Sequence, residues 1–279
     1  MTPRDQTLVD TQPRSWATYL TLLVVLLTQG CSTPTERANR FAARNGFARY
    51  VMQGEEFQHV VFEKRGDGRG RELHVYIDGD GSPYVNRWTV SADPTPRDPV
   101  MLRLMKLDAT SSAYVGRPCY YGLATSPPCT PLDWSLGRFS EKNVESLARV
   151  IDQLSRTEGA TAVELYGHSG GGALAVLIAR RLSNVRRIVT LGGNLDTQTW
   201  TRYHHYDALR ESLNPADGGP LPPGIIQLHV AAERDQIVPA WLIEAAARRL
   251  GSGAVVVLSG ADHTCCWAAH WKEYVTAEK

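Results

Sequence analysis

The chain has 279 residues, of which 43% are hydrophobic and 21% are charged, and its formal net charge at pH 7 is +1. A chain of this length and apolar content can bury one large core, so we expect a single main domain. Its basic residues are scattered along the sequence, whereas proteins that bind nucleic acids cluster Lys and Arg against the phosphate backbone. The composition therefore argues against a nucleic-acid partner.

The first 30 residues have the pattern of an export signal. Arg14 precedes an apolar run from Trp16 to Leu27, which is shorter than the roughly 20 residues that a membrane-spanning helix needs. The sequence Leu-Thr-Gln-Gly-Cys then ends at Cys31 and resembles a bacterial lipoprotein signal. That resemblance implies that residues 1–30 are removed, that Cys31 carries a lipid, and that the protein is held at a membrane of the cell envelope. A signal cleaved without lipidation and an uncleaved anchor are the alternatives, and all three place the protein outside the cytoplasm.

Residues 31–56 are mostly polar and predict a tether that leads into a first short helix, so we place the start of the main domain at residue 57. Strands are predicted at Phe57–Glu63 and Leu73–Ile77, joined by a glycine-rich hairpin loop. The next loop contains Asp80 in the sequence Asp-Gly-Asp-Gly-Ser-Pro. It does not fit a calcium loop, because Pro83 occupies the position at which that loop requires glycine.

Two pairs of cysteines follow. A proline-rich loop joins Cys119 to Cys129, and in an exported protein such a pair most simply forms a local disulfide. Cys265 and Cys266 are adjacent, and the sequence leaves open whether they bond to each other or whether one pairs elsewhere. We therefore predict one disulfide, between Cys119 and Cys129.

The most informative stretch is a Gly-x-Ser-x-Gly pattern centred on Ser169. A predicted strand, Thr161–Tyr166, leads into it, and a predicted helix, Gly170–Leu182, follows. A serine in a sharp turn between strand and helix exposes its hydroxyl, and the N–H groups of the helix start, beginning with Gly170, point to the same spot. This arrangement suits a nucleophile beside an oxyanion site. A dinucleotide-binding turn and a plain glycine-rich turn are the alternatives for the same residues.

The rest of the chain alternates strands and helices. Further strands are predicted at residues 113–116, 185–191, 225–231 and 254–258, and helices at 99–108, 140–156, 241–250 and about 266–276. This alternation predicts an α/β fold in which helices cover both faces of a mainly parallel sheet. The segment from about 193 to 223 is long and aromatic, which predicts a lid-like insertion. Its His204-His205 pair has no acidic or cysteine partner at ligand spacing, so we expect no metal site there.

Two motifs near the C-terminus complete the pattern that Ser169 begins. Asp235 opens an Asp-x-x-Val-Pro motif after one predicted strand, and His263 ends a Gly-Ala-Asp-His motif after the last strand. The chain order serine, aspartate, histidine is that of the α/β-hydrolase family, which residues 57–279 resemble. The resemblance implies that Ser169 is the nucleophile, His263 the general base and Asp235 the acid that orients it. It also implies that backbone N–H groups of Gly170 and Asp80 hold the oxyanion, and that no cofactor or metal is needed.

Other acids and other activities remain open from the sequence. Asp196, Glu233 and Asp262 are rival candidates for the acid, because each lies near a strand end or beside His263. The resemblance implies hydrolysis of a small acyl substrate, most simply a carboxylic ester, with thioesterase and peptidase activity as alternatives. Tryptophans at positions 134, 200 and 241 favour an apolar or aromatic acyl group. A non-catalytic envelope lipoprotein that uses the fold as a binding scaffold is the alternative from another class, and the sequence does not define the oligomeric state.

Overall fold

A computed structural model describes residues 32–66, 71–252 and 254–276 of the chain. The predicted export signal and Cys31 lie outside these residues. From Pro34 onward the described chain belongs to one compact unit. No helix within the described ranges is both long and apolar enough to cross a membrane.

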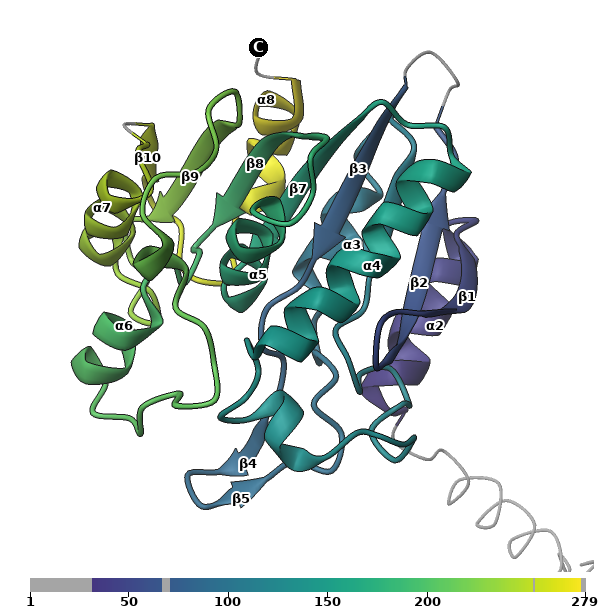
Figure 1. The fold of residues 1–279 in the computed structure, drawn as a ribbon, viewed down its shortest axis with the longest axis horizontal. Helices are drawn as coiled ribbons and strands as arrows, with labels where there is room; N and C mark the ends of the chain where they lie inside the picture. Colours follow the sequence, from purple (N-terminus) through teal and green to yellow (C-terminus); the bar gives the residue numbers. More distant parts are fainter. Residues whose placement is uncertain (1–31, 67–70, 253, 277–279) are drawn as a thin grey trace, which may run out of the picture. The chain divides into compact units, whose positions relative to one another are not determined.

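An eight-stranded sheet forms the centre of this unit, in the order β1-β2-β6-β3-β7-β8-β9-β10 (Figure 1). Its strands are β1 (Ala48–Gln53), β2 (Gln58–Lys64), β3 (Glu72–Ile77), β6 (Ser112–Val115), β7 (Ala162–His168), β8 (Val185–Leu191), β9 (Ile226–Ala232) and β10 (Val255–Leu258). Strands β1, β2 and β6 pair antiparallel, and every pairing from β6 to β10 is parallel. The prediction of a mainly parallel sheet is therefore confirmed.

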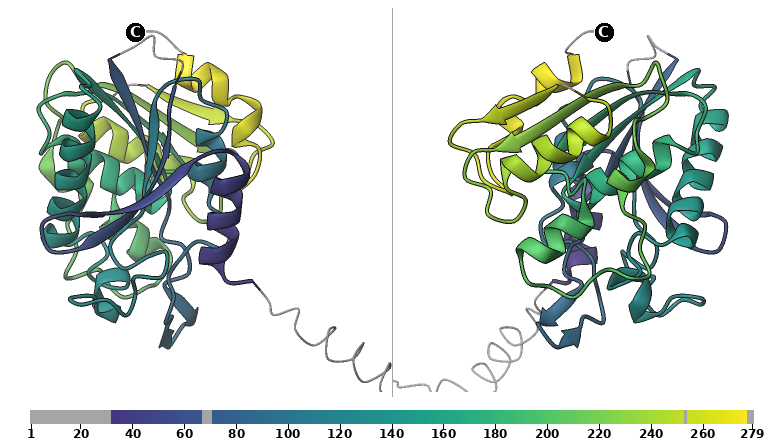
Figure 2. Two further views of the ribbon diagram at one scale, coloured as in Figure 1. Left: turned by 90° about the vertical axis from the view of Figure 1, so that its right-hand side faces the viewer. Right: turned by 60° about the vertical axis from the view of Figure 1, so that its left-hand side comes forward.

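Helices cover both faces of the sheet, as the run of apolar strands requires (Figures 1 and 2). One apolar core joins the sheet to α4 (Glu141–Thr157), α5 (Gly170–Ala179) and α7 (Ala240–Arg249). The other core joins it to α2 (Pro34–Arg44), α3 (Val100–Met105) and α8 (Trp271–Thr276). Shorter elements lie in the connections: the β4 (Tyr84–Asn86) and β5 (Thr89–Val90) hairpin, α6 (Thr197–Tyr203), and the 3-10 turns η1 (Pro131–Trp134), η2 (Pro215–Gly218) and η3 (Trp267–Ala269). All ten residues of α5 are buried, which explains why its sequence shows no polar face.

Three predictions about elements need correction. The range 31–56 holds the predicted helix but also strand β1, which pairs with β2, so the sheet begins before residue 57. Strands β2 and β3 do not form a hairpin, because β6 lies between them. The segment 193–223 is not loop throughout, since it contains α6 and η2.

Candidate active site

Ser169 occupies the turn between β7 and α5 in a strained conformation. Its φ of 53° and ψ of −121° fall in a region that residues other than glycine rarely adopt, at a cost of about 1–3 kcal/mol. The turn is possible because the glycines beside it allow close approach. A Cβ atom added at Gly171 would lie 2.1 Å from the Ile77 carbonyl oxygen, and one added at Gly167 would lie 2.4 Å from that of Gly171. Strand, turn and helix thus hold the serine at the carboxyl end of the central strands.

His263 and Asp235 are brought together from the segments that follow β10 and β9. The Nδ1 atom of His263 donates to Oδ2 of Asp235 over 2.7 Å, and the Asp235 carboxylate is fully buried. Its other oxygen, Oδ1, accepts hydrogen bonds from the backbone N–H groups of Ile237 and Val238, both at 2.8 Å. These bonds fix the carboxylate, and the carboxylate fixes the proton on Nδ1. The Nε2 atom of His263 is then the one that can accept a proton.

The rival acids are engaged elsewhere. Asp196 caps α6 through the N–H of Thr199 and pairs with Arg249. Glu233 accepts hydrogen bonds from the hydroxyl of Ser259 and the N–H of Gly260. Asp262 accepts from the backbone N–H groups of residues 264 and 265. The structure thus brings Asp235, and none of these three, to the imidazole of His263.

Ser169 and His263 line one cleft of about 1110 Å³, together with Asp80. The segment 193–223 supplies part of its wall, as a lid-like insertion would. The residues that it contributes are Trp200, Thr201, His204, His205, Tyr206, Asp207 and Leu209. Of the three tryptophans that favoured an apolar substrate, Trp200 reaches the cleft, whereas Trp134 is buried and Trp241 is exposed outside it.

The loop after β3 packs against the serine. A Cβ atom added at Gly79 would lie 3.1 Å from Cβ of Ser169, so Asp80 follows directly on the residue that touches the nucleophile. The Asp80 carboxylate is clamped by Arg117 at 2.5 Å and Arg138 at 2.6 Å. Burial alone would raise the pKa of Asp80, but the two guanidinium groups outweigh it and lower the pKa to about 2. This clamp fixes the loop that carries the predicted second oxyanion donor.

The two arginines of this clamp were missed by sequence reasoning. Both are buried, although arginine is a residue type that sequence patterns assign to the surface. Their partner lies 37 residues before Arg117 and 58 before Arg138, so no local spacing could have indicated the pairs. Sequence reasoning gave Asp80 a backbone role only; the ion pairs of its side chain are an addition from the structure.

His168 precedes Ser169 at the end of β7 and holds the loop that carries His263. Its Nε2 atom donates to the backbone carbonyl of His263 over 2.7 Å, and Nε1 of Trp267 donates to the same oxygen over 3.1 Å. Burial lowers the pKa of His168 to about 4, so the ring is neutral at pH 7 and its single proton lies on Nε2. The backbone of His263 is thus fixed by two donors.

The cysteines form two pairs at bonding distance. Cys119 lies against Cys129, in the arrangement predicted from the sequence, and Cys265 lies against its neighbour Cys266. Between the first two, the Tyr120 hydroxyl donates to the backbone carbonyl of Asp80 over 2.8 Å. The loop from residue 119 to 129 therefore also braces the loop beside Ser169.

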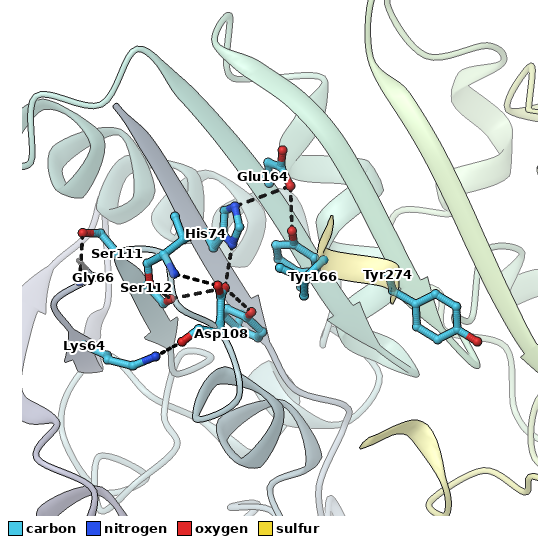
Figure 3. Close-up of polar contacts among 12 residues, drawn as sticks. Lys64, Gly66, His74, Asp108, Ser111, Ser112, Glu164, Tyr166 and Tyr274 are labelled. Atoms are coloured by element: carbon cyan, nitrogen blue, oxygen red, sulfur yellow. Dashed lines mark hydrogen bonds and ion pairs between the residues drawn. The ribbon is translucent and has the colours of Figure 1, made fainter. Parts of the chain in front are cut away.

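A second polar cluster lies inside the sheet on β3 and β7 (Figure 3). Within the part of the chain that the structure describes, Glu72, His74 and Glu164 are the group whose ligand atoms lie close enough, within 4.8 Å, to hold a metal ion. Their charges already have partners, because Arg186 pairs with both glutamates. The Nδ1 atom of His74 donates to Asp108 over 2.6 Å. These contacts describe a partly buried network of ion pairs and hydrogen bonds, and we assign the cluster a structural role.

Comparison with solved structures identifies the fold of this chain. The sequence matches no protein-family model and no curated protein. Solved structures do match. The fold is the α/β-hydrolase fold. A Pyrococcus furiosus esterase superposes with a TM-score of 0.57 at 12% identity, over 89% of this chain and 93% of its own.

Two further structures extend the comparison. A membrane phospholipase A, described as a bacterial virulence factor, has a TM-score of 0.54 at 14% identity and covers 93% of this chain and 97% of its own. A Pyrococcus horikoshii acylaminoacyl peptidase has a TM-score of 0.54 at 13% identity, over 82% of this chain but 40% of that enzyme. Identities this low establish the fold and do not transfer an activity.

Proposed function

We propose that this protein is a serine hydrolase that cleaves carboxylic esters through an acyl-enzyme on Ser169. The observation that carries the proposal is the hydrogen bond between His263 and the buried carboxylate of Asp235, which two backbone N–H groups hold in place. His263 and Ser169 line the same cleft. An aspartate held in this way has no evident use in a binding scaffold. It does have a use beside a histidine that must take up and release a proton.

The proposed reaction follows from the positions of the groups. Nε2 of His263 takes the proton of the Ser169 hydroxyl while the oxygen attacks the ester carbonyl carbon. The resulting oxyanion is held by backbone N–H groups of Gly170 and Asp80, and one such donor is typically worth about 3 kcal/mol of barrier. The C–O bond to the leaving alcohol then breaks, and the alcohol takes the proton from His263. A water molecule then gives a proton to the same nitrogen and attacks the acyl carbon. The bond between that carbon and the Ser169 oxygen breaks, the serine takes the proton back from His263, and the acid leaves.

Serine-directed labelling tests the proposal directly. A fluorophosphonate probe should modify the protein at Ser169, as mapped by mass spectrometry, and Ser169→Ala should abolish hydrolysis of a short-chain p-nitrophenyl ester. The variant should stay folded, because the substitution removes one oxygen at a site already adapted to the turn. Ser126→Ala, in the loop between Cys119 and Cys129, is the matched control and should retain both labelling and turnover. Undiminished activity of Ser169→Ala would exclude the assignment.

Labelling also separates the alternatives. A binding scaffold of the same fold would neither label at Ser169 nor turn over any acyl substrate. A thioesterase or peptidase would label, but would prefer a thioester or an amide to the matched ester. The apolar side chains of Trp200, Leu209 and Ile237 in the cleft favour an ester with an apolar acyl chain.

We further propose that the protein is held at an envelope membrane by a lipid on Cys31. The short apolar run before this cysteine supports the proposal. Cys31→Ala should release the protein from the membrane fraction or block its processing, whereas Ser32→Ala should leave anchoring intact. Metabolic labelling with a fatty acid and intact-mass analysis of the mature protein provide the measurement. A soluble native protein with an unmodified N-terminus at another residue would refute the anchor.

A further inference from the structure

The β4–β5 hairpin exposes the most accessible large apolar side chains of the described residues. Trp88 is 80% exposed and Val85 is 68% exposed. The tip is an ordered turn, since Oδ1 of Asn86 accepts hydrogen bonds from the backbone N–H groups of Trp88 and Thr89. The hairpin projects from the end of the molecule to which β3 points (Figures 1 and 2). Apolar side chains presented on a formed, projecting turn mark a binding surface.

A second group of exposed apolar side chains belongs to the lid-like segment and to residues 237–241. Tyr203, Tyr206, Ile237 and Trp241 are each between 46% and 57% exposed. The rings of Tyr203 and Trp241 pack edge to face at 5.5 Å, and Tyr206 and Ile237 line the cleft together with Trp88. Apolar side chains from the hairpin and from this second group thus line the cleft together with Ser169, and both groups are rich in the residue types that settle at the boundary of a lipid bilayer.

Cations accompany the hairpin tip. The Arg87 guanidinium lies over the Trp88 ring, 4.6 Å from its centre. Arg97 lines the cleft and also a cavity of about 390 Å³ behind the hairpin, where Arg37 and Asp93 are the other charged residues. Positive charge beside an exposed tryptophan complements the phosphate groups of a lipid surface.

The chain enters the compact unit beside this hairpin. Pro34, the first residue of α2, lines the same small cavity as Tyr84 and Val85. Cys31 is three residues earlier, which is at most about 11 Å of extended chain. A lipid on Cys31 would therefore hold the hairpin close to the bilayer that carries it.

From these observations we propose that Val85 and Trp88 insert into the surface of a lipid bilayer, with Arg87 on lipid phosphates. The cleft then opens against the membrane. This contact is additional to the anchor on Cys31 and does not depend on hydrolysis, so its test is independent of the proposed function.

Vesicle binding tests the contact in a chain without the anchor. Residues 34–279 form a compact unit that contains both apolar cores, so a chain of residues 32–279 is suitable. It should co-sediment with phosphatidylcholine vesicles, and more strongly when they contain 30% phosphatidylglycerol. Trp88→Ala and Val85→Asp should each weaken binding at least about tenfold. Arg87→Glu should weaken binding to both kinds of vesicle, and more strongly, by about tenfold, on the anionic ones.

Leu107→Asp is the matched control, because Leu107 is 42% exposed and lines neither cavity. It should bind as the parent does, and Val85→Asp, whose site is outside the cleft, should still hydrolyse a soluble ester at the parent rate. The proposal fails if the parent chain does not bind vesicles, or if Leu107→Asp loses as much binding as Trp88→Ala. It also fails if the parent is a dimer that Val85→Asp separates, since a second copy would then cover the tip. Absence of ester hydrolysis in every chain, with vesicle binding as expected, would contradict the proposed function alone.

Discussion

The Asp235 carboxylate accepts three hydrogen bonds, and their geometry determines what its replacement should do. Oδ1 accepts two backbone N–H groups and Oδ2 accepts Nδ1–H of His263. In Asp235→Asn the amide oxygen can keep the two backbone bonds, so the fold should survive. The amide nitrogen would then face His263 and donate to Nδ1, which moves the imidazole proton to Nε2. A histidine in that tautomer cannot accept the proton of Ser169.

We therefore predict that Asp235→Asn lowers kcat by as much as about 10⁴-fold, in line with the same change in other serine triads. The melting temperature should change little, and steady-state kinetics with a soluble ester give the measurement. Asp196→Asn and Glu233→Gln are the matched controls and should keep turnover within a few-fold of the parent. Near-normal kcat in Asp235→Asn, with loss in Asp196→Asn, would show that the acid is misassigned.

At the scale of elements, the loop from Cys119 to Cys129 links stability to the site. Closing a loop of this size lowers the conformational entropy of the unfolded chain, which stabilises the native state by about 2.5–3 kcal/mol. The double variant Cys119→Ala/Cys129→Ala should lose about that much free energy of unfolding in urea. It should also lose ester turnover, because Tyr120 no longer braces the carbonyl of Asp80.

The other pair provides the control for this prediction. Cys265 and Cys266 are adjacent, so a bond between them closes almost no chain, and Cys265→Ala/Cys266→Ala should change the free energy of unfolding by less than about 1 kcal/mol. A non-reducing peptide map of the native protein completes the test. Cys119 found as a free thiol, or bonded to a residue other than Cys129, would contradict the predicted pairing.

Elements with a local signal could be predicted from the sequence, and pairings between distant segments could not. The run Val185–Leu191 is β8 over its full length. The strand, turn and helix around Ser169 are also present, although β7 extends to His168 and α5 ends at Ala179, three residues before the predicted end. Strand β1 was missed because four of its six residues are exposed and it lies within a segment, residues 31–56, that is mostly polar and resembles a tether. Strand β6 lies between β2 and β3 because of contacts across the sheet, and such contacts produce no spacing pattern in the sequence.

The same distinction holds for the candidate site, where residues in local motifs could be predicted and contacts between distant segments could not. Ser169, Asp235 and His263 stand in motifs with recognisable neighbours, so the sequence could indicate them as candidates. The clamp on Asp80 and the bond from His168 to the His263 carbonyl join residues 37 or more positions apart. The β4–β5 hairpin was missed for another reason, since strands of three and two residues are too short to show alternation.

At the scale of the whole molecule, buried histidines make stability depend on pH. Burial lowers the pKa of His59, His168 and His229 to about 4, whereas unfolded histidine titrates near 6.5. Below pH 6.5 the histidines of the unfolded chain therefore bind protons, whereas the same three histidines in the native state stay neutral until the pH approaches 4. The histidine contribution to the free energy of unfolding is therefore complete above pH 6.5. It falls by about 3 kcal/mol for each histidine as the pH is lowered to 4. Asp78 opposes this trend, because burial raises its pKa to about 7 and the native state takes up its proton first.

Protonation of Asp78 adds about 4 kcal/mol to the free energy of unfolding as the pH falls from 7 to 3.8. The three histidines together lower the same free energy by about 9 kcal/mol. The net loss of about 5 kcal/mol is comparable with the whole stability of many domains. We therefore predict that the urea midpoint falls steeply between pH 6.5 and 4.5 and that the protein unfolds near pH 4 without denaturant. His229→Gln should flatten this slope by about a third of the histidine contribution. A midpoint that is constant from pH 7 to 4.5 would mean that these rings are protonated in the native state and that burial does not hold them neutral.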